Sequence, residues 1–410
     1  MSSNTSNDPG AASRISERKL LFIIAAVQFV NVLDFMMVMP LGPDFAQALA
    51  IPTPQLGVIG ASYTASAAVA GVVGAFVLDR FDRRRALAVT LAGLVVATAA
   101  GGFSWDLHSM VATRILAGAF GGPATSLALA IVSDVVPPER RGRAMGVVMS
   151  AFSVASVLGV PAGLELARFG GWSLPFFAVA LLGAVLALAA VWLLPPLRPA
   201  APSGGGDVGW TFLRRPGVMA ALCAVGLAMA ANFMFIPNLA TYWQFNFGYP
   251  RERLGLLYLV GGAVSFAAMQ VVGRLVDRLG ATVVAAFGTL VYVGCVYVSF
   301  VAPQYSWPVL ALFVALMGTA SFRFIPMQSL ASRVPPPAER ARYMSAQSAV
   351  QHVASAAGAL VASRLLSEAP GGRLVGMDRV GVASMVLGAS LPFLLWSVEG
   401  RVRARERELA

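Results

Sequence analysis

Three fully charged side chains stand inside long apolar stretches of the sequence. Asp34, Arg114 and Arg323 are each flanked on both sides by uncharged, mostly apolar residues over more than a helical turn. An ionised side chain at the centre of a membrane-spanning helix costs roughly 2.5–3.5 kcal/mol on insertion scales. We therefore expect each charge to be paired, to be protonated or to face water, and these residues are the first candidates for chemistry.

Asp34 and Arg114 have the composition of a proton-coupling pair. Asp34 lies deep within its apolar run, and Arg114 lies at a similar depth in another run. A carboxylate that exchanges a proton as its charged neighbours and its surroundings change can link proton movement to the arrival of a substrate. The alternative interpretation is a fixed ion pair that joins two helices, and the sequence leaves both interpretations open.

Arg323 has no acidic residue at an obvious matching depth in the second half of the chain. Three interpretations are open for this residue. It neutralises an anionic substrate, it pairs with Asp34 across a cavity, or it extends its charge along the helix to the membrane surface.

Uncharged hydrogen-bonding groups also occur inside apolar runs of the second half, at Asn232, Asn238, Gln347, Gln351 and His352. Gln347 and Gln351 are four residues apart and so share one face of a helix. With Asp34 and Arg323, these residues are the candidates for a substrate cavity. Polar side chains also hold membrane helices together, and a lone histidine is more often a packed partner, so a structural role is the alternative for each.

A short polar stretch occurs twice between long apolar runs. Asp79-Arg80 opens a charged segment in the first half, and Asp277-Arg278 lies in the same setting 198 residues later. The same offset separates Asp34 from Asn232. Internal repetition on this scale indicates two halves built in the same way. In membrane proteins with such repeats, the substrate site is expected at the interface of the halves, near the bilayer midplane.

The composition is that of a membrane protein. Hydrophobic residues make up 58% of the chain, charged residues 12%, and the mean hydropathy is +0.74. A soluble domain carries about 25% charged residues, and a membrane span needs about 20 apolar residues. We expect an all-α polytopic membrane protein with twelve transmembrane helices in two six-helix halves. The net charge of +11 comes from short basic clusters between spans, so it does not predict nucleic-acid binding.

The arrangement of apolar runs and polar segments divides the chain into five parts. They are an N-terminal tail over 1–19, a first half over 20–197, a Pro- and Gly-rich linker over 198–216, a second half over 217–398 and a C-terminal tail over 399–410. Of the Lys and Arg residues, 22 fall on the side of the N-terminus and 6 on the opposite side. Because basic residues accumulate on the cytoplasmic side, we expect both termini to be cytoplasmic.

Several classes of function lack their motifs. The sequence has no glycine-rich phosphate loop followed by Lys and Ser or Thr, no metal-ligand cluster and no serine elbow. We therefore expect no enzyme activity, no cofactor and no metal. A membrane receptor or scaffold is the non-transport alternative, although such a protein would usually carry a soluble output domain.

The motifs together resemble those of the major facilitator superfamily, whose loop between helices 2 and 3 reads Gly-x-x-x-Asp-Arg-x-Gly-Arg-Arg. The matching positions are Asp79, Arg80, Arg83 and Arg84 in the first half, and Gly273, Asp277, Arg278 and Gly280 in the second. Ala75 and Asp82 replace the two glycines of the first loop. Arg114-x-x-x-Gly118-x-x-x-Gly122 resembles the second motif of the family, and the segment 159–163, Gly-Val-Pro-Ala-Gly, is similar to its antiporter motif.

The resemblance implies a transporter that works by alternating access. In that family the loop after helix 2 helps to latch the two halves, so the implied latch residues are Asp79, Arg80, Arg83, Arg143, Asp277 and Arg278. Helices 1 and 4 both line the central cavity, which would bring Asp34 and Arg114 together. The branch that fits best exports drugs or metabolites, such as siderophores, in exchange for protons. Proton symport or facilitated uptake of a small nutrient is the alternative.

The partners implied by this resemblance are a small-molecule substrate, protons and the lipid bilayer. We expect a monomer in the inner membrane of a bacterium.

Overall fold

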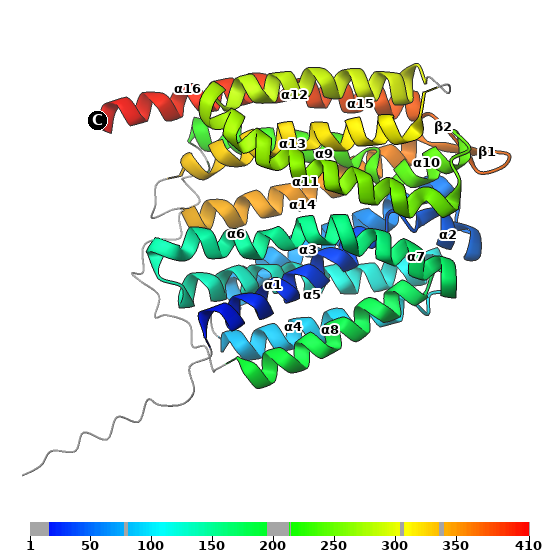
Figure 1. Ribbon diagram of the computed structural model, residues 1–410, viewed down its shortest axis with the longest axis horizontal. Helices are drawn as coiled ribbons and strands as arrows, with labels where there is room; N and C mark the ends of the chain where they lie inside the picture. Colours follow the sequence, from blue (N-terminus) through cyan, green and yellow to red (C-terminus); the bar gives the residue numbers. More distant parts are fainter. Residues whose placement is uncertain are drawn as a thin grey trace, which may run out of the picture.

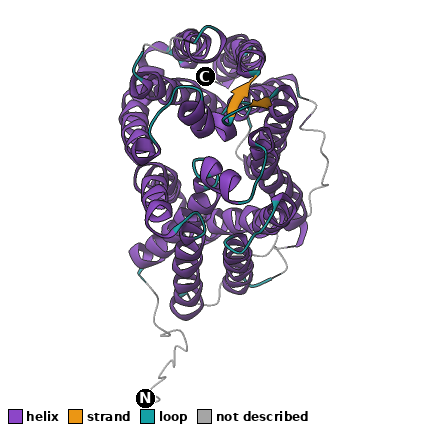
Figure 2. Cartoon of the chain, turned by 90° about the vertical axis from the view of Figure 1, so that its right-hand side faces the viewer, coloured by secondary structure: helices purple, strands orange, loops and turns teal. Residues whose placement is uncertain are grey.

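The computed structural model describes residues 16–77, 81–194, 213, 215–303, 307–335 and 340–409. Long helices run side by side along one direction (Figure 1). The start of α1 and the C-terminus lie at one end of this bundle, here called the terminal end, and a short β-hairpin lies at the other, here called the hairpin end (Figure 1). Figure 2 looks onto the hairpin end, so that most helices are seen along their axes.

The first half contains six spanning units, and the fifth is interrupted. These units are α1 (Glu17–Met37), α3 (Leu56–Val77), α4 (Arg83–Gly101), α5 (Leu107–Val135), α6 (Pro138–Val154) with η3 (Ala155–Gly159) and α7 (Val160–Gly170), and α8 (Leu174–Leu193). The short α2 (Gly42–Ala48) and η1 (Thr53–Gln55) connect α1 to α3. In η3 the helix widens to a π-helical turn just before Pro161, because a proline cannot supply the regular backbone hydrogen bond.

The second half repeats this order. Its spanning units are α9 (Pro216–Phe233), α11 (Leu254–Leu279), α12 (Ala281–Val296) with η7 (Tyr297–Val301), α13 (Val309–Arg333), α14 (Arg340–Leu365), and α15 (Met377–Ala389) with α16 (Leu391–Leu409). Three short helices, η5 (Ile236–Asn238), α10 (Leu239–Phe245) and η6 (Arg251–Arg253), connect α9 to α11. Most of the linker expected over 198–216 lies outside the described residues.

The expectation of twelve spans is confirmed, and the spans differ in how apolar they are. Eleven helical segments of the described chain are long and apolar enough to cross a membrane. The remaining unit, α14, has 26 residues, which is ample length for a crossing, but it is too polar to qualify by composition. Its glutamines, serines and histidine are tolerated because it packs between α3 of the first half and α9 of the second.

A two-stranded hairpin interrupts the otherwise helical architecture and was not expected from the sequence. Strands β1 (Ser367–Ala369) and β2 (Arg373–Val375) pair antiparallel between α14 and α15. Gly371 and Gly372 close the turn with φ values of +82° and +78°, a conformation that residues with a Cβ rarely adopt.

The outer surface of the bundle is apolar. Side chains such as Leu181, Leu290 and Val386 are 68–73% exposed although they are purely hydrocarbon. Large aromatic side chains are exposed near both ends, for example Trp105 and Trp396, as in the aromatic belts of membrane proteins. The protein is therefore a multi-pass membrane protein whose lipid-facing surface replaces the polar surface of a soluble domain.

Small residues allow the helices inside each half to approach closely. Gly118 and Gly122 of α5 lie directly against the backbone of α3. A Cβ atom at Gly118 would collide with the carbonyl oxygen of Tyr63, and one at Gly122 would come within 2.7 Å of the carbonyl oxygen of Ala67. Close packing of this kind drives helix association where no hydrophobic effect acts between helices.

The two halves contact each other at the hairpin end. Asp44 of α2 accepts two hydrogen bonds from Arg251 of η6, at 2.6 and 2.5 Å. Glu368 of β1 accepts hydrogen bonds from the backbone N–H and the hydroxyl of Thr53, at 2.8 and 3.1 Å. These carboxylates join first-half and second-half segments that are 207 and 315 residues apart in the chain.

Towards the terminal end the contacts between the halves diminish. From the second half, α11 packs against the fifth span of the first half. It contacts η3 and α7, which form the hairpin-end part of that span. A Cβ atom on Gly71 of α3, Gly146 of α6 or Gly273 of α11 would meet nothing within 4 Å. The halves are thus held together mainly at one end of the bundle.

The packing of α5 on α3 leads to a matched pair of substitutions. We expect Gly118→Ala to lower the stability by about 1–3 kcal/mol, because the added methyl group overpacks the interface. Gly71→Ala adds the same methyl group in open space and should be neutral or stabilise by roughly 0.5–1 kcal/mol, since alanine favours the helix. Thermal unfolding of both variants in detergent measures the difference, and equal stabilities would contradict the close approach at Gly118.

Candidate functional site

Asp34 is completely enclosed by protein inside the first half. Its side chain is 0% exposed. The carboxylate accepts hydrogen bonds from Nη1 of Arg114, at 3.1 Å to Oδ1 and 3.3 Å to Oδ2. The hydroxyl of Thr98 donates a third, at 2.7 Å to Oδ1. The structure therefore brings together the two residues that the sequence predicted to meet, and it adds a hydroxyl from α4 that the sequence analysis missed.

The helix that carries Arg114 begins at a well-formed N-terminal cap. The Asp106 side chain accepts a hydrogen bond from the backbone N–H of Ser109 at 2.8 Å, and the Ser109 hydroxyl lies 3.1 Å from the backbone N–H of Asp106. This reciprocal arrangement satisfies donors that a helix start leaves free. The hydrogen bond from the Ser109 N–H lowers the pKa of Asp106 from its ordinary value. The cap fixes the start of α5, two turns before Arg114.

The surroundings of Arg114 leave room for a guanidinium and little else. Arg114 is 1% exposed, and its charged group lies 5.2 Å from the centre of the Phe176 ring. A Cβ atom on Gly101 of α4 would come within 2.9 Å of Nη2 of Arg114. The absence of a side chain at Gly101 therefore makes space for the cation beside α4, and an aromatic ring from α8 covers it.

A second polar cluster adjoins Asp34 on the same helix. Asn31 lies one turn earlier in α1 and donates hydrogen bonds to the carbonyl of Gly121 at 2.9 Å and to the hydroxyl of Thr125 at 2.5 Å. The hydroxyl of Tyr63 donates to Oδ1 of Asn31 at 3.2 Å. Sequence reasoning missed Asn31, although its spacing of three residues from Asp34 places both on one face of a helix.

Arg323, on α13, is a buried arginine of the second half. It is 2% exposed, so it does not extend to the membrane surface. Its Nη1 donates to Oδ1 of Asn232 at 3.1 Å, whereas Asp34 is bound to Arg114. In this conformation Arg323 therefore neither reaches the membrane surface nor pairs with Asp34, and its contact with an anionic substrate stays a prediction.

An aromatic ring and a hydroxyl complete the surroundings of Arg323. Its guanidinium lies 3.8 Å from the centre of the Tyr292 ring, a distance at which a cation is attracted to the ring face. The Tyr292 hydroxyl lies 2.5 Å from the Ser384 hydroxyl, which in turn donates to the carbonyl of Ala231 at 2.6 Å. The ring is therefore held in place by hydrogen bonds from α12 through α15 to α9.

The two halves meet at a pair of equivalent residues. Phe35 and Phe233 are separated by the same 198 residues as the other repeated positions, and their rings stack with centroids 6.1 Å apart and planes 25° apart. Equivalent residues of a repeat that touch each other lie next to its pseudo-two-fold axis. This aromatic pair, here called the seam pair, therefore marks the middle of the interface, where the repeat predicted a substrate site.

The remaining candidates are distributed over several surroundings. Gln347 is buried and donates to Gln328 of α13 at 2.5 Å, which is the helix-joining role. Gln351 and His352 are partly exposed on α14. Asn238 is fully buried at the hairpin end of the second half, and its amide has no hydrogen-bond partner in the described part of the chain. Among the hydrogen bonds of the described residues, the bond from Arg323 to Asn232 joins two members of this group.

The predicted latch residues are only partly described. Asp79 and Arg80 lie outside the described residues. Arg83 is largely buried and pairs at 3.3 Å with Asp134 of α5, within the same half. Arg143 is exposed at the start of the fifth span. A latch between the halves therefore stays a prediction.

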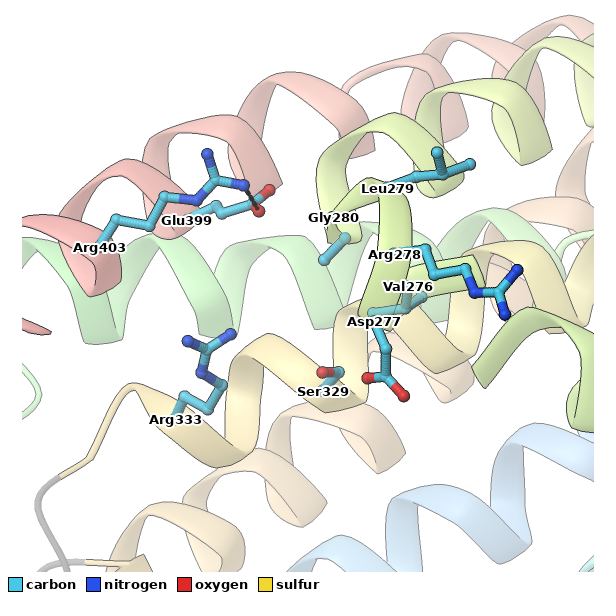
Figure 3. Close-up of a pocket in the computed structure, with 10 residues that line it drawn as sticks. Val276, Asp277, Arg278, Leu279, Gly280, Ser329, Arg333, Glu399 and Arg403 are labelled. Carbon is cyan, nitrogen blue, oxygen red and sulfur yellow. Dashed lines mark hydrogen bonds and ion pairs between the residues drawn. The ribbon is translucent and has the colours of Figure 1, made fainter. Parts of the chain in front are cut away.

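In the second half, Asp277 and Arg278 border a pocket of about 340 Å³ at the terminal end (Figure 3). Both side chains are exposed. Figure 3 shows Glu399 and Arg403 of α16 on the far side, joined to each other by an ion pair of 2.5 Å. Glu399 also accepts hydrogen bonds from the backbone N–H and the hydroxyl of Thr282, at 2.9 and 2.5 Å. It caps α12 and ties it to α16, so this carboxylate is occupied within its own half.

Comparison with known proteins identifies the family and related transporters. The sequence profile of the Major Facilitator Superfamily matches residues 24–359. A chloramphenicol resistance protein of Streptomyces lividans is 29% identical over 358 residues, which cover 86% of this chain and 90% of that protein. The purine ribonucleoside efflux pump NepI of Escherichia coli strain K12 is 29% identical over 284 residues, covering 66% of this chain and 68% of the pump.

Solved structures share the fold. A bacterial homologue of the human lysosomal transporter Spinster, in an inward-facing and occupied conformation, superimposes with a TM-score of 0.74 at 15% identity and covers 94% of this chain and 98% of its own. The human organic anion transporter MFSD10 (TETRAN) gives a TM-score of 0.66 at 21% identity, covering 93% of this chain and 100% of its own. At these identities the likeness concerns the fold.

The buried ion pair leads to a prediction about stability. Removing one partner of such a pair typically costs about 3–5 kcal/mol, because the other charge is left buried alone. We expect Arg114→Gln to destabilise the protein by this order at mildly alkaline pH. Adding Asp34→Asn to the same variant should recover much of the loss, since no lone charge then remains. Thermal unfolding of the two single variants and the double variant measures the coupling, and strictly additive losses would contradict a direct pair.

Proposed function

The chain belongs to the Major Facilitator Superfamily and is a transporter, and from this premise we propose that it exports a small organic molecule in exchange for protons. The observation that carries the proposal is the enclosed Asp34 carboxylate. Its 0% exposure and its hydrogen bonds to Arg114 and Thr98 support its proposed role as the proton carrier. A proton that binds there removes the charge that the arginine neutralises.

The relatives support export as the direction of transport. One is a chloramphenicol resistance protein and another a purine ribonucleoside efflux pump. The molecules in these names are small, polar and ring-containing. We infer that this transporter expels compounds of similar size, and the seam pair Phe35 and Phe233 offers rings against which an aromatic molecule packs.

We further propose that the terminal end faces the cytoplasm, as the distribution of basic residues predicts. The conformation described here would then be closed towards the outside by Asp44 with Arg251 and by Glu368 with Thr53. Export requires this closure to open while the terminal end closes. Each of the two contacts joins a carboxylate of one half to a donor of the other half. Both contacts therefore break when the halves rotate about the seam pair.

The coupling follows from competition between substrate and proton, which favour different arrangements of α1. When the carboxylate is ionised, it holds Arg114 and joins α1 to α5. A proton taken up by Asp34 weakens this pair and frees α1, which also carries Phe35 at the seam. Substrate that packs on Phe35 and Phe233 favours the arrangement of α1 in which the proton has left. A ligand shifts such an equilibrium only through its different affinity for the two states.

The central test of this proposal is proton release from the purified protein. Addition of chloramphenicol or inosine to detergent-solubilised wild type should release protons, because substrate and proton compete for one arrangement of α1. Asp34→Asn, which resembles the protonated state, should bind the compound more weakly and, at saturating compound, release no proton. As a control, Asp378→Asn removes an exposed acid at the hairpin end of the second half and should behave as the wild type does.

Proton release by Asp34→Asn equal to that of the wild type would contradict the role of Asp34. Transport in proteoliposomes then separates the remaining possibilities. Under an imposed pH gradient, an exporter that exchanges protons moves substrate opposite to the proton flow, whereas a symporter moves substrate with it. Binding of the compound without any transport would indicate a receptor.

The orientation has its own test. Reporter fusions after Arg215, between the halves, and after Ala410 should both report a cytoplasmic location, because 22 basic residues lie on that side and 6 on the other. A fusion after Trp105, in the connection between α4 and α5, should report the opposite side and serves as the internal control. A cytoplasmic signal from all three fusions, or an external signal after Arg215, would contradict the assignment.

A further inference from the structure

Arg323 is a buried cation that no carboxylate in the described part of the chain neutralises. Its side chain is 2% exposed. Nη1 donates to the neutral amide of Asn232, and Nε and Nη2 have no hydrogen-bond acceptor among the described residues. An amide and an aromatic ring stabilise a cation but do not cancel its charge. A guanidinium in such surroundings attracts any anion that can reach it.

The first half shows what is missing. Asn232 stands 198 residues after Asp34, whereas Arg323 stands 209 residues after Arg114. The two arginines are therefore not at equivalent positions of the repeat, although their surroundings are alike. Each lies over an aromatic ring, Phe176 at 5.2 Å for Arg114 and Tyr292 at 3.8 Å for Arg323. The rings come from different spans, α8 and α12. The group that accepts from Nη1 also differs, a carboxylate in the first half and an amide in the second.

A glycine lies beside each arginine as well. Cβ atoms on Gly101 and Gly388 would lie 2.9 and 3.1 Å from Nη2 of Arg114 and Arg323, respectively. In the described part of the second half, Arg323 thus has surroundings like those of the charge pair but without the acid. Arg323 with Asn232 carries a net charge of one positive unit, whereas Arg114 with the ionised Asp34 is neutral as a pair.

The position of Asn232 connects this charge to the interface between the halves. Asn232 is partly exposed and directly precedes Phe233, which stacks on Phe35 in the seam pair. An asparagine amide carries both an acceptor and two donors. If an oxyanion approaches from the seam, rotation of this amide replaces its acceptor with its NH₂ group, and Nη1 of Arg323 is released to bind the same anion.

We propose that Arg323 and Asn232 bind the anionic group of a substrate, a carboxylate or a comparable oxyanion, whose aromatic part lies against Phe35 and Phe233. This inference rests on the proposed transport function for its substrate path, but it does not depend on proton coupling. The proposed site predicts which charge the substrates carry. Aromatic anions are preferred over neutral compounds of the same shape, and aromatic cations are disfavoured by the uncompensated guanidinium.

The test uses three probes with one fluorescent ring system and different charges. Dansylglycine carries a carboxylate, dansylamide is neutral, and dansylcadaverine carries an ammonium group. Binding to detergent-solubilised wild type, without any pH gradient, is followed by the fluorescence of the probe. A charge-assisted hydrogen bond in place of a neutral contact corresponds to about tenfold in affinity. We expect dansylglycine to bind about tenfold more tightly than dansylamide, and dansylcadaverine to bind most weakly.

Two variants locate the preference. Arg323→Gln removes the charge, and Asn232→Asp supplies an internal carboxylate next to Nη1 that competes with the probe. Each should reduce the affinity for dansylglycine about tenfold and leave that for dansylamide unchanged. Arg379→Gln, which removes an exposed arginine of the same half, is the matched control and should keep the wild-type preference. Dansylamide binding reports that each variant is folded.

The outcomes separate this inference from the proposed function. Equal binding of dansylglycine and dansylamide to the wild type would overturn the anion site, as would a preference that survives in Asn232→Asp. If Arg323→Gln does not fold, Asn232→Asp decides, because it retains the arginine. An anion preference together with no substrate-driven proton release would leave the site in place and contradict only the coupling through Asp34.

Discussion

A carboxylate enclosed by protein within a membrane requires a positive partner, and much of the first half is arranged to supply one. Arg114 reaches Asp34 from α5, Thr98 reaches it from α4, and the ring of Phe176 covers the arginine from α8. Four spans are thereby joined around a single pair of charges. Removal of either charge alone would leave the other buried without its partner.

The second half also buries an arginine, Arg323, although not at the position equivalent to Arg114. Where the first half has an acid, the second has Asn232, and Arg323 remains without a carboxylate among the described residues. A charge pair and an arginine without a described carboxylate therefore lie in the two halves that meet at Phe35 and Phe233.

Much of this could be predicted from the sequence because a membrane span leaves a direct signal. Apolar runs and basic loops indicated the spans, and the offset of 198 residues indicated the halves. The meeting of Asp34 with Arg114 was expected from matching depth and from the family resemblance. The partners that were missed, Thr98 and Asn31 in the first half and Tyr292 in the second, depend on how each helix is rotated about its axis. Spans that are apolar all round carry little periodicity from which to read that rotation.

Other differences have similarly local causes. The bond of Gln347 to Gln328 of a neighbouring helix was not expected, since it depends on how the two helices face each other, and a substrate contact of Gln347 stays a prediction. The β-hairpin was missed because three-residue strands carry too little alternation to recognise, although Gly371 and Gly372 formed a visible turn signal. The closure at the hairpin end depends on contacts over 207 and 315 residues of chain, which spacing alone does not reveal.

The most direct test of the account is to observe the Asp34 proton itself. Infrared difference spectroscopy of the purified protein, recorded before and after addition of a transported compound at constant pH, reports the carbonyl stretch of a protonated carboxylic acid. The account predicts that this band decreases when substrate binds, and that Asp34→Asn lacks the change while Asp378→Asn retains it. The same decrease in Asp34→Asn would contradict the account, because the proton would then leave another group.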